Sequence, residues 1–181
     1  MNLPNKLTML RIFLIIPFVI VLLTNCLGDA SSIVALIIFV VASLTDLLDG
    51  KIARKYNLVT NFGKFMDPLA DKVLVSSAMI CLVAIKPDVM PAWAVIIILA
   101  REFIISGFRL VASDAGIVIA ASWWGKCKTV SQMVMVILML AAIPGEAMRI
   151  VTMIVMYVAV ILTVISLVDY VWKNRQVIAD K

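Results

Sequence analysis

Histidine is absent from this chain of 181 residues, and charged residues make up only 15% of it. The lack of histidine removes the commonest general base and the commonest ligand of transition metals. Acid–base or metal chemistry must therefore run on carboxylates, whose oxygen atoms suit hard cations such as Mg²⁺ or Mn²⁺. The three cysteines are scattered and form no CxxC pair, so we interpret them as small apolar side chains.

The scarcity of charge accompanies a surplus of apolar side chains, which reach 64% with a mean hydropathy of +1.14. A soluble domain is nearer half apolar and a quarter charged, so lipid is the natural solvent for this chain. The net charge is +5, but the basic residues lie at the ends of apolar runs without interleaved aromatics. This placement argues against nucleic acid as a partner. The length of the chain fits one domain over residues 1–181.

Six apolar runs approach the length of about 20 residues that a membrane-spanning helix needs. Turn-forming residues separate the runs, among them Gly28, Pro87, Pro91 and Pro144. We expect an all-α integral membrane protein with six transmembrane helices and a short juxtamembrane segment at Asn2–Asn5. The expected spans cover roughly 7–24, 33–55, 68–86, 91–112, 125–143 and 148–172.

The lysines and arginines are distributed unevenly between the two ends of these spans. Only Lys86 and Arg149 fall on one side, and Arg101 lies inside the fourth span. The other basic residues gather on the opposite side, which the positive-inside rule assigns to the cytosol. Both termini and the loops near 55–67 and 112–125 are therefore expected to face the cytosol.

Four aspartates stand out, because a charge inside a membrane is costly. Asp46 and Asp49 lie near the cytosolic end of the second span, and Asp67 and Asp71 lie at the start of the third. Spacings of three and four residues place each pair on one helix face. The short connection between these spans predicts antiparallel neighbours whose four carboxylates meet at one membrane depth.

Four clustered carboxylates repel one another unless protons or cations neutralise them. One or two divalent cations would do so, and a pair suits displacement at phosphorus. The alternative, four independent solvated aspartates, leaves the repeated spacing unexplained. Nearby Gly50, Ala53 and Gly63 leave room for a ligand, although packing alone is an alternative for Gly50 and Ala53. Arg54 suits a phosphate, or it is only a cytosolic anchor.

These residues lie in one stretch, which reads Asp46-x2-Asp49-Gly50-x2-Ala53-Arg54-x8-Gly63-x3-Asp67-x3-Asp71. The pattern resembles the complete signature of the CDP-alcohol phosphotransferases, with eight fixed positions within 26 residues. The resemblance implies a fold of six transmembrane helices with a juxtamembrane N-terminal segment. It also implies a homodimer in a bacterial plasma membrane, with a polar active-site cavity that opens to the cytosol.

The same resemblance implies roles for the signature residues. Asp46, Asp49 and Asp67 would be metal ligands, and Asp71 would bind metal and act as base toward the acceptor hydroxyl. The implied cofactor is Mg²⁺ or Mn²⁺, as two ions. Contacts to the CDP-linked lipid are implied for residues of the signature and of the N-terminal block that runs from Asn2 to Arg11, namely Asn5, Thr8, Gly50, Ala53, Arg54 and Gly63.

Three further blocks resemble family members that transfer a phosphatidyl group from CDP-diacylglycerol to glycerol 3-phosphate. They are the N-terminal block, Ala100-Arg101-Glu102-Phe103 with Gly107 and Arg109 after it, and Gly125-Lys126-x-Lys128-Thr129. A dianionic acceptor beside four aspartates requires compensating cations, for which we expect Arg101, Arg109, Lys126 and Lys128. The alternatives are a buried structural ion pair between Arg101 and Glu102 and positive-inside anchoring by the two lysines.

In the expected reaction, the primary hydroxyl of glycerol 3-phosphate gives its proton to Asp71. It then attacks the β-phosphorus of CDP-diacylglycerol and releases CMP. Within the family, inositol phosphate, serine or phosphatidylglycerol are alternative acceptors. A cation transporter is a more distant alternative, but it predicts carboxylates near the bilayer midplane and a repeat symmetry that the sequence lacks. A purely structural membrane scaffold explains none of the spacing.

Overall fold

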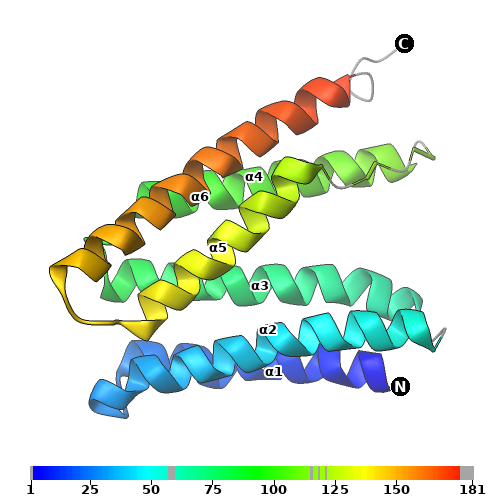
Figure 1. Cartoon of the computed structure of the whole chain (residues 1–181). Helices are drawn as coiled ribbons and strands as arrows, with labels where there is room; N and C mark the ends of the chain where they lie inside the picture. Colours follow the sequence, from blue (N-terminus) through cyan, green and yellow to red (C-terminus); the bar gives the residue numbers. More distant parts are fainter. Residues whose placement is uncertain (1, 57–59, 115, 118, 121, 176–181) are drawn as a thin grey trace. The chain divides into compact units, whose positions relative to one another are not determined.

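The computed structural model describes residues 2–56, 60–114, 116–117, 119–120 and 122–175. In these residues it contains six α-helices, a short 3₁₀ turn (η1) and no β-strand, which confirms the all-α prediction (Figure 1). The elements are α1 (Leu3–Thr24), η1 (Gly28–Ala30), α2 (Ser31–Lys55), α3 (Asn61–Ile85), α4 (Ala92–Asp114), α5 (Trp123–Ala141) and α6 (Glu146–Lys173).

The start of α1 differs from the expected separate juxtamembrane segment. Asn2 is the N-cap, and its side chain accepts a hydrogen bond of 3.4 Å from the backbone N–H of Asn5. Pro4 occupies the first turn, where its missing N–H costs nothing and its fixed φ suits a helix. These local signals extend the helix through Asn2–Asn5, so this segment is the first turn of α1.

α3 begins at Asn61, about two turns before the predicted start at 68. The reason is again a cap, because the Thr60 hydroxyl accepts a hydrogen bond of 3.0 Å from the backbone N–H of Gly63. Pro68 lies within the helix and does not end it. The longer helix incorporates Asp67 into a regular turn one turn ahead of Asp71.

Four segments within the described residues are long and apolar enough to cross a membrane, which indicates an integral membrane protein. They are Leu3–Thr24, Gly28–Asp46, Phe65–Ile85 and Glu146–Lys173. α4 and α5 are long as well but carry charged residues, four of them in α4 at Arg101, Glu102, Arg109 and Asp114. Neither helix is among these four candidate spans.

Contacts divide the chain into two compact units, and the first comprises Met1–Lys86 with Val136–Ile143. In this unit α1 packs along both α2 and α3. Phe18 and Phe39, both fully buried, bring their ring centroids within 6.2 Å between α1 and α2. The opposite face of α1 exposes large apolar side chains such as Phe13 and Ile16, as expected for a helix in contact with lipid.

The second unit comprises Pro87–Met135 with Pro144–Lys181, and its main packing is between α4 and α6. Ile105, Phe108 and Tyr170 form its buried apolar cluster, with the two rings edge to face at 5.7 Å. Polar residues are also buried here, including Arg101 and Ser166. The unit therefore combines an apolar cluster with a polar interior.

Candidate active site

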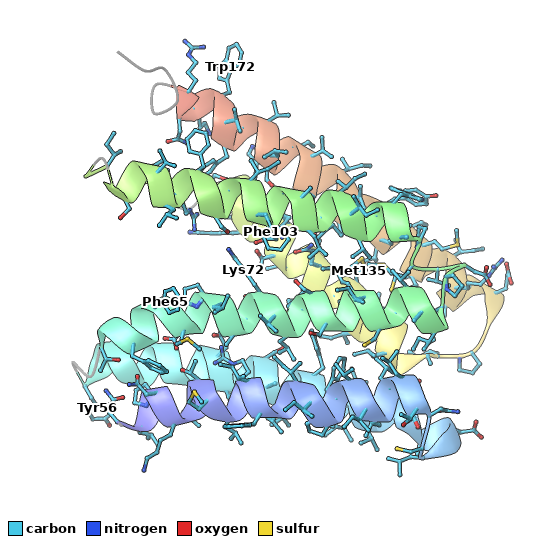
Figure 2. All side chains as sticks on the ribbon, turned by 180° about the vertical axis from the view of Figure 1, so that it is seen from behind. Tyr56, Phe65, Lys72, Phe103, Met135 and Trp172 are labelled. Atoms are coloured by element: carbon cyan, nitrogen blue, oxygen red, sulfur yellow. The ribbon has the colours of Figure 1, made fainter. Side chains whose placement is uncertain are left out.

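Three helix ends meet at one end of the first unit. These are the N-terminal end of α1, the C-terminal end of α2 and the N-terminal end of α3 (Figures 1 and 2). Figure 2 marks this end with Tyr56, just after α2, and with Phe65 in the second turn of α3. The aspartate signature spans these two helix ends, so the fold gathers its residues at one end of the unit.

Asp46 of α2 pairs with Arg11 of α1. The Arg11 Nη1 donates to Asp46 Oδ1 at 2.5 Å, and the Arg11 side chain is 0% exposed. The Asp46 carboxylate is 33% exposed, so it reaches the surface while its Oδ1 is held from the buried side. Burial of Arg11 strengthens this charge-assisted bond, because water does not compete for its guanidinium group.

Asp67 of α3, like Asp46, has its partner on α1. The Thr8 Oγ1 lies 2.6 Å from Asp67 Oδ1, which accepts its hydrogen bond, and 3.1 Å from the Pro4 carbonyl oxygen one turn earlier. Thr8 is 0% exposed. α1 therefore holds one carboxylate of α2 and one of α3 at the same end of the unit.

The start of α3 is tied to α1 by a second set of polar contacts. The Thr60 hydroxyl donates to Asn5 Oδ1 at 2.9 Å while it caps α3. A Cβ at Gly63 would lie 3.3 Å from both Asn5 Oδ1 and Thr60 Oγ1, and 3.5 Å from Asp67 Oδ2. The absence of a side chain at Gly63 thus lets these polar side chains lie close to the start of α3.

The remaining signature residues are described to different extents. Asp71 is half-buried one turn after Asp67, and Gly50 is half-buried near the end of α2. The side chains of Asp49, Ala53 and Arg54 lie outside the described residues. The predicted contacts of Asn5, Thr8, Gly50, Ala53, Arg54 and Gly63 with a CDP-linked lipid therefore stay predictions.

The described carboxylates fit a hard divalent cation in their donor chemistry, since they supply oxygen ligands and the chain has no histidine. Asp46 and Asp67 come from two helices and are both anchored by α1. Among the side chains that the structure describes, no group of three or more metal-ligating residues is assembled, and Asp49 is outside this set. The four-aspartate metal site stays a prediction.

A second polar cluster lies in the other unit, and Glu102 of α4 is at its centre. Glu102 Oε1 accepts from Arg101 Nη1 at 3.1 Å and from the Lys128 ammonium group of α5. Arg101 and Lys128 are both buried. An ion pair between Arg101 and Glu102 was one of the alternatives drawn from the sequence, but Lys128 was not predicted to be its third member.

α6 completes this cluster. The Arg101 Nε donates to Ser166 Oγ at 3.0 Å. The Arg109 Nε donates at 3.3 Å to the hydroxyl of Tyr170, which lies one turn after Ser166 on α6. Arg101 and Arg109, which are eight residues apart, therefore share a face of α4 that meets α6. Sequence analysis missed Ser166 and Tyr170, whose only signal was a set of polar residues at helical spacing within an apolar run.

The two lysines of α5 differ in their surroundings. Lys128 is buried and bonded to Glu102, whereas Lys126 is exposed. Gly125 lies beside them, and a Cβ there would be 3.3 Å from Arg101 Nη2. Arg101, Lys128 and Gly125 thus form one close-packed group, while Arg109 and Lys126 lie outside it.

Two of the four signature aspartates, Asp46 and Asp67, are thus both bonded to α1 in the first unit. The CDP-alcohol phosphatidyltransferase family matches residues 1–165. The match covers most of the chain, so the protein belongs to this family, which confirms the resemblance drawn from the signature.

Individual relatives cover nearly the whole chain. A CDP-diacylglycerol–glycerol-3-phosphate 3-phosphatidyltransferase of Bacillus subtilis is 48% identical over 96% of this chain and 95% of its own. The relative of that name in Rickettsia typhi is 40% identical over 93% of this chain and 94% of its own. A probable phosphatidylglycerophosphate synthase of Mycobacterium tuberculosis H37Rv is 40% identical over 94% of this chain and 80% of its own.

Proposed function

We propose that this protein transfers the phosphatidyl group of CDP-diacylglycerol to sn-glycerol 3-phosphate, giving phosphatidylglycerophosphate and CMP. The observation that carries the proposal is that α1 anchors Asp46 of α2 and Asp67 of α3 at one end of the first unit. Family membership supports the phosphatidyl transfer, and the names of the relatives support both substrates.

The proposed metal ligands are Asp46, Asp49, Asp67 and Asp71, which would hold two Mg²⁺ or Mn²⁺ ions. When bound, the metal neutralises charge on the diphosphate and on the CMP leaving group. The carboxylates keep the cations at the helix ends. The CDP-linked lipid would be contacted by Asn5, Thr8, Gly50, Ala53, Arg54 and Gly63.

Asp71 is the proposed base. It takes the proton of the primary hydroxyl of glycerol 3-phosphate, whose oxygen forms the new bond to the β-phosphorus. The bond from that phosphorus to the bridging oxygen breaks, and CMP leaves with the electron pair. An ordinary aspartate has a pKa of about 4, so the transfer depends on a hydroxyl acidified by its surroundings.

The acceptor phosphate is proposed to bind to the basic residues of α4 and α5. Arg101 and Lys128 share the carboxylate of Glu102, so this buried trio retains a formal charge of about +1 for an anion. Lys126 is exposed at the start of α5, where the helix N-terminus also favours negative charge. An uncharged acceptor would require none of these cations, so they favour a phosphorylated one.

We further propose that all six helices span the membrane as one domain, with both termini in the cytosol and with homodimer formation. The charges of α4 oppose insertion if they are isolated. Here Glu102 is bonded to both Arg101 and Lys128, and this pairing lowers the cost of placing α4 and α5 in lipid. With six spans, the basic residues other than Lys86, Arg149 and Arg101 lie on the cytosolic side.

The experiment that tests the proposed function is a CMP-release assay on the purified protein in detergent, with CDP-diacylglycerol and Mg²⁺ or Mn²⁺. Glycerol 3-phosphate, serine, inositol phosphate and phosphatidylglycerol are supplied in turn as acceptors. We expect metal-dependent release with glycerol 3-phosphate. Release with another acceptor only would overturn the acceptor assignment, and no release with any of them would overturn the transferase proposal.

A further inference from the structure

We propose that Thr8 and Arg11 of α1 are positioning residues that orient Asp67 and Asp46, respectively, toward a bound divalent cation. The inference rests on the proposed function in one respect, because it takes these two aspartates as metal ligands. It assigns to α1, which carries none of the signature aspartates, the task of orienting the carboxylates of two other helices.

The two donors occupy one face of α1. Thr8 and Arg11 are three residues apart, a spacing that places side chains on the same side of a helix. Both are 0% exposed, and their bonds reach different helices, from Thr8 to α3 and from Arg11 to α2. A single rigid face of α1 therefore determines where both carboxylate groups lie.

The chemistry of these contacts exceeds what helix packing requires. Burial of a guanidinium group carries a desolvation penalty that its partner repays only in good geometry, and an apolar side chain of similar size would often pack α1 against α2 at no greater cost. Thr8 could satisfy its hydroxyl with the Pro4 carbonyl of its own helix, yet the shorter of its two contacts, 2.6 Å against 3.1 Å, is to Asp67. Both polar side chains are directed to carboxylates.

The contacts engage one oxygen of each carboxylate. Both bonds go to Oδ1, and the Oδ2 of Asp67 lies on the side of Gly63, 3.5 Å from where a Cβ would be. A hydrogen bond to one oxygen restricts rotation of the carboxylate and so limits the directions that its other oxygen can take. Outer partners of this kind orient metal ligands, and their removal lowers metal affinity or activity by about 10–100-fold.

The decisive comparison is between Thr8→Val and Thr8→Ser. Valine has nearly the shape of threonine but lacks the hydroxyl, whereas serine retains it. We expect Thr8→Val to weaken Mn²⁺ binding by about 10–100-fold. The measurement is a titration of the detergent-solubilised protein with Mn²⁺, in which electron paramagnetic resonance reports the free Mn²⁺. We expect Thr8→Ser to bind Mn²⁺ as the wild type does. In turnover, Thr8→Val should raise the Mg²⁺ concentration for half-maximal rate.

Arg11 is tested with Arg11→Lys and Arg11→Met. Lysine keeps the charge but loses the planar fork, so both variants should weaken Mn²⁺ binding if geometry decides. Tighter binding in Arg11→Met would instead mean that Arg11 acts only by repelling the cation. Thr24→Val is the matched control on α1, because Thr24 is exposed and bonds to the carbonyl of Ile20 within its own helix. Its Mn²⁺ affinity should equal that of the wild type.

The results separate this inference from the proposed function. If the wild type is active with glycerol 3-phosphate and folded Thr8→Val has wild-type Mn²⁺ affinity, the positioning role is wrong and the function stands. If Thr8→Val raises the KM for CDP-diacylglycerol and leaves the Mn²⁺ affinity at the wild-type value, Thr8 serves only the proposed lipid contact and the inference is overturned. If Thr8→Val weakens Mn²⁺ binding but glycerol 3-phosphate is not the acceptor, the inference stands and the acceptor assignment fails.

Discussion

Asp71 is the residue with the most specific proposed task, and its replacement by asparagine tests that task. The amide is nearly isosteric but cannot take a proton, so Asp71→Asn should lower the rate of CMP release by about 10²-fold or more. The helical fold should survive, because the residue is only half-buried on a long helix. Circular dichroism and size-exclusion chromatography check the fold.

The control for this variant is Asp88→Asn, which neutralises an exposed aspartate outside the signature. It should retain wild-type activity. If Asp71→Asn keeps more than about a tenth of the wild-type rate, no essential base lies at this position.

Glu102 is the second residue whose contacts lead to a prediction. Its carboxylate is shared by two buried cations, and removal of one partner from a buried ionic group costs about 3–5 kcal/mol. We therefore expect Glu102→Gln to lower the thermal unfolding temperature in detergent. Addition of Lys128→Met to this variant removes one of the two cations, and the double variant should be more stable than the sum of the single effects implies.

An exposed ion pair provides the comparison for this cycle. Glu146 and Arg149 form an i, i+3 pair whose side chains are 71% and 53% exposed. Such pairs contribute about 0–1 kcal/mol, so Glu146→Gln should hardly change the unfolding temperature. Equal effects of Glu146→Gln and Glu102→Gln would show that the buried network has no special weight.

At the scale of helices, periodicity and breakers predicted all six elements, with bounds that differ from the observed ones by a few residues. The larger differences arise at the starts of α1 and α3, where Asn2 and Thr60 act as caps. Contacts between helices were harder to predict. Arg11 and Asp46 are 35 positions apart in the sequence, and only the packing of α1 on α2 brings them together.

Contacts between helices were also hard to predict at α4. Adjacent Arg101 and Glu102 suggested an ion pair from the sequence alone, since neither is expected alone in an apolar run. Lys128 was assigned independently, as a phosphate ligand or an anchor. Its bond to Glu102 depends on the approach of α5 to α4, which helical periodicity within one segment does not encode.

That approach depends on Gly125, which yields a prediction at the scale of the element. A Cβ at Gly125 would lie 3.3 Å from Arg101 Nη2, whose side chain is held by Ser166 and Glu102. Gly125→Ala should therefore displace Arg101 and raise the KM for glycerol 3-phosphate several-fold, with a smaller change in kcat. Steady-state CMP release measures both constants.

Gly107→Ala on α4 is the matched control, because nothing lies within 4 Å of its added Cβ. Alanine favours a helix over glycine by up to about 1 kcal/mol, so this variant should be as stable as the wild type or slightly more so. A similar KM for glycerol 3-phosphate in both variants would show that Gly125 has no part in binding the acceptor.

At the scale of the whole molecule, the number of membrane crossings decides how the sequence is threaded through the bilayer. Ser113 distinguishes the two possibilities, since it is exposed near the end of α4. If all six helices span, α4 returns the chain to the cytosol and Ser113 lies there. If only the four candidate spans cross the membrane, Ser113 stays on the outer side with the end of α3.

We therefore predict that Ser113→Cys, in a chain with its three native cysteines replaced by serine, reacts with a membrane-impermeant maleimide in inverted membrane vesicles but not in intact cells. The native Cys26, exposed in the turn after α1, serves as the opposite reference when it is kept as the sole cysteine. It should be labelled in intact cells. Labelling of both positions from outside would favour four spans, because Ser113 then lies on the outer side. In that case the charges of α4 and α5 would remain at the membrane surface, and their pairing through Glu102 would stabilise the fold alone.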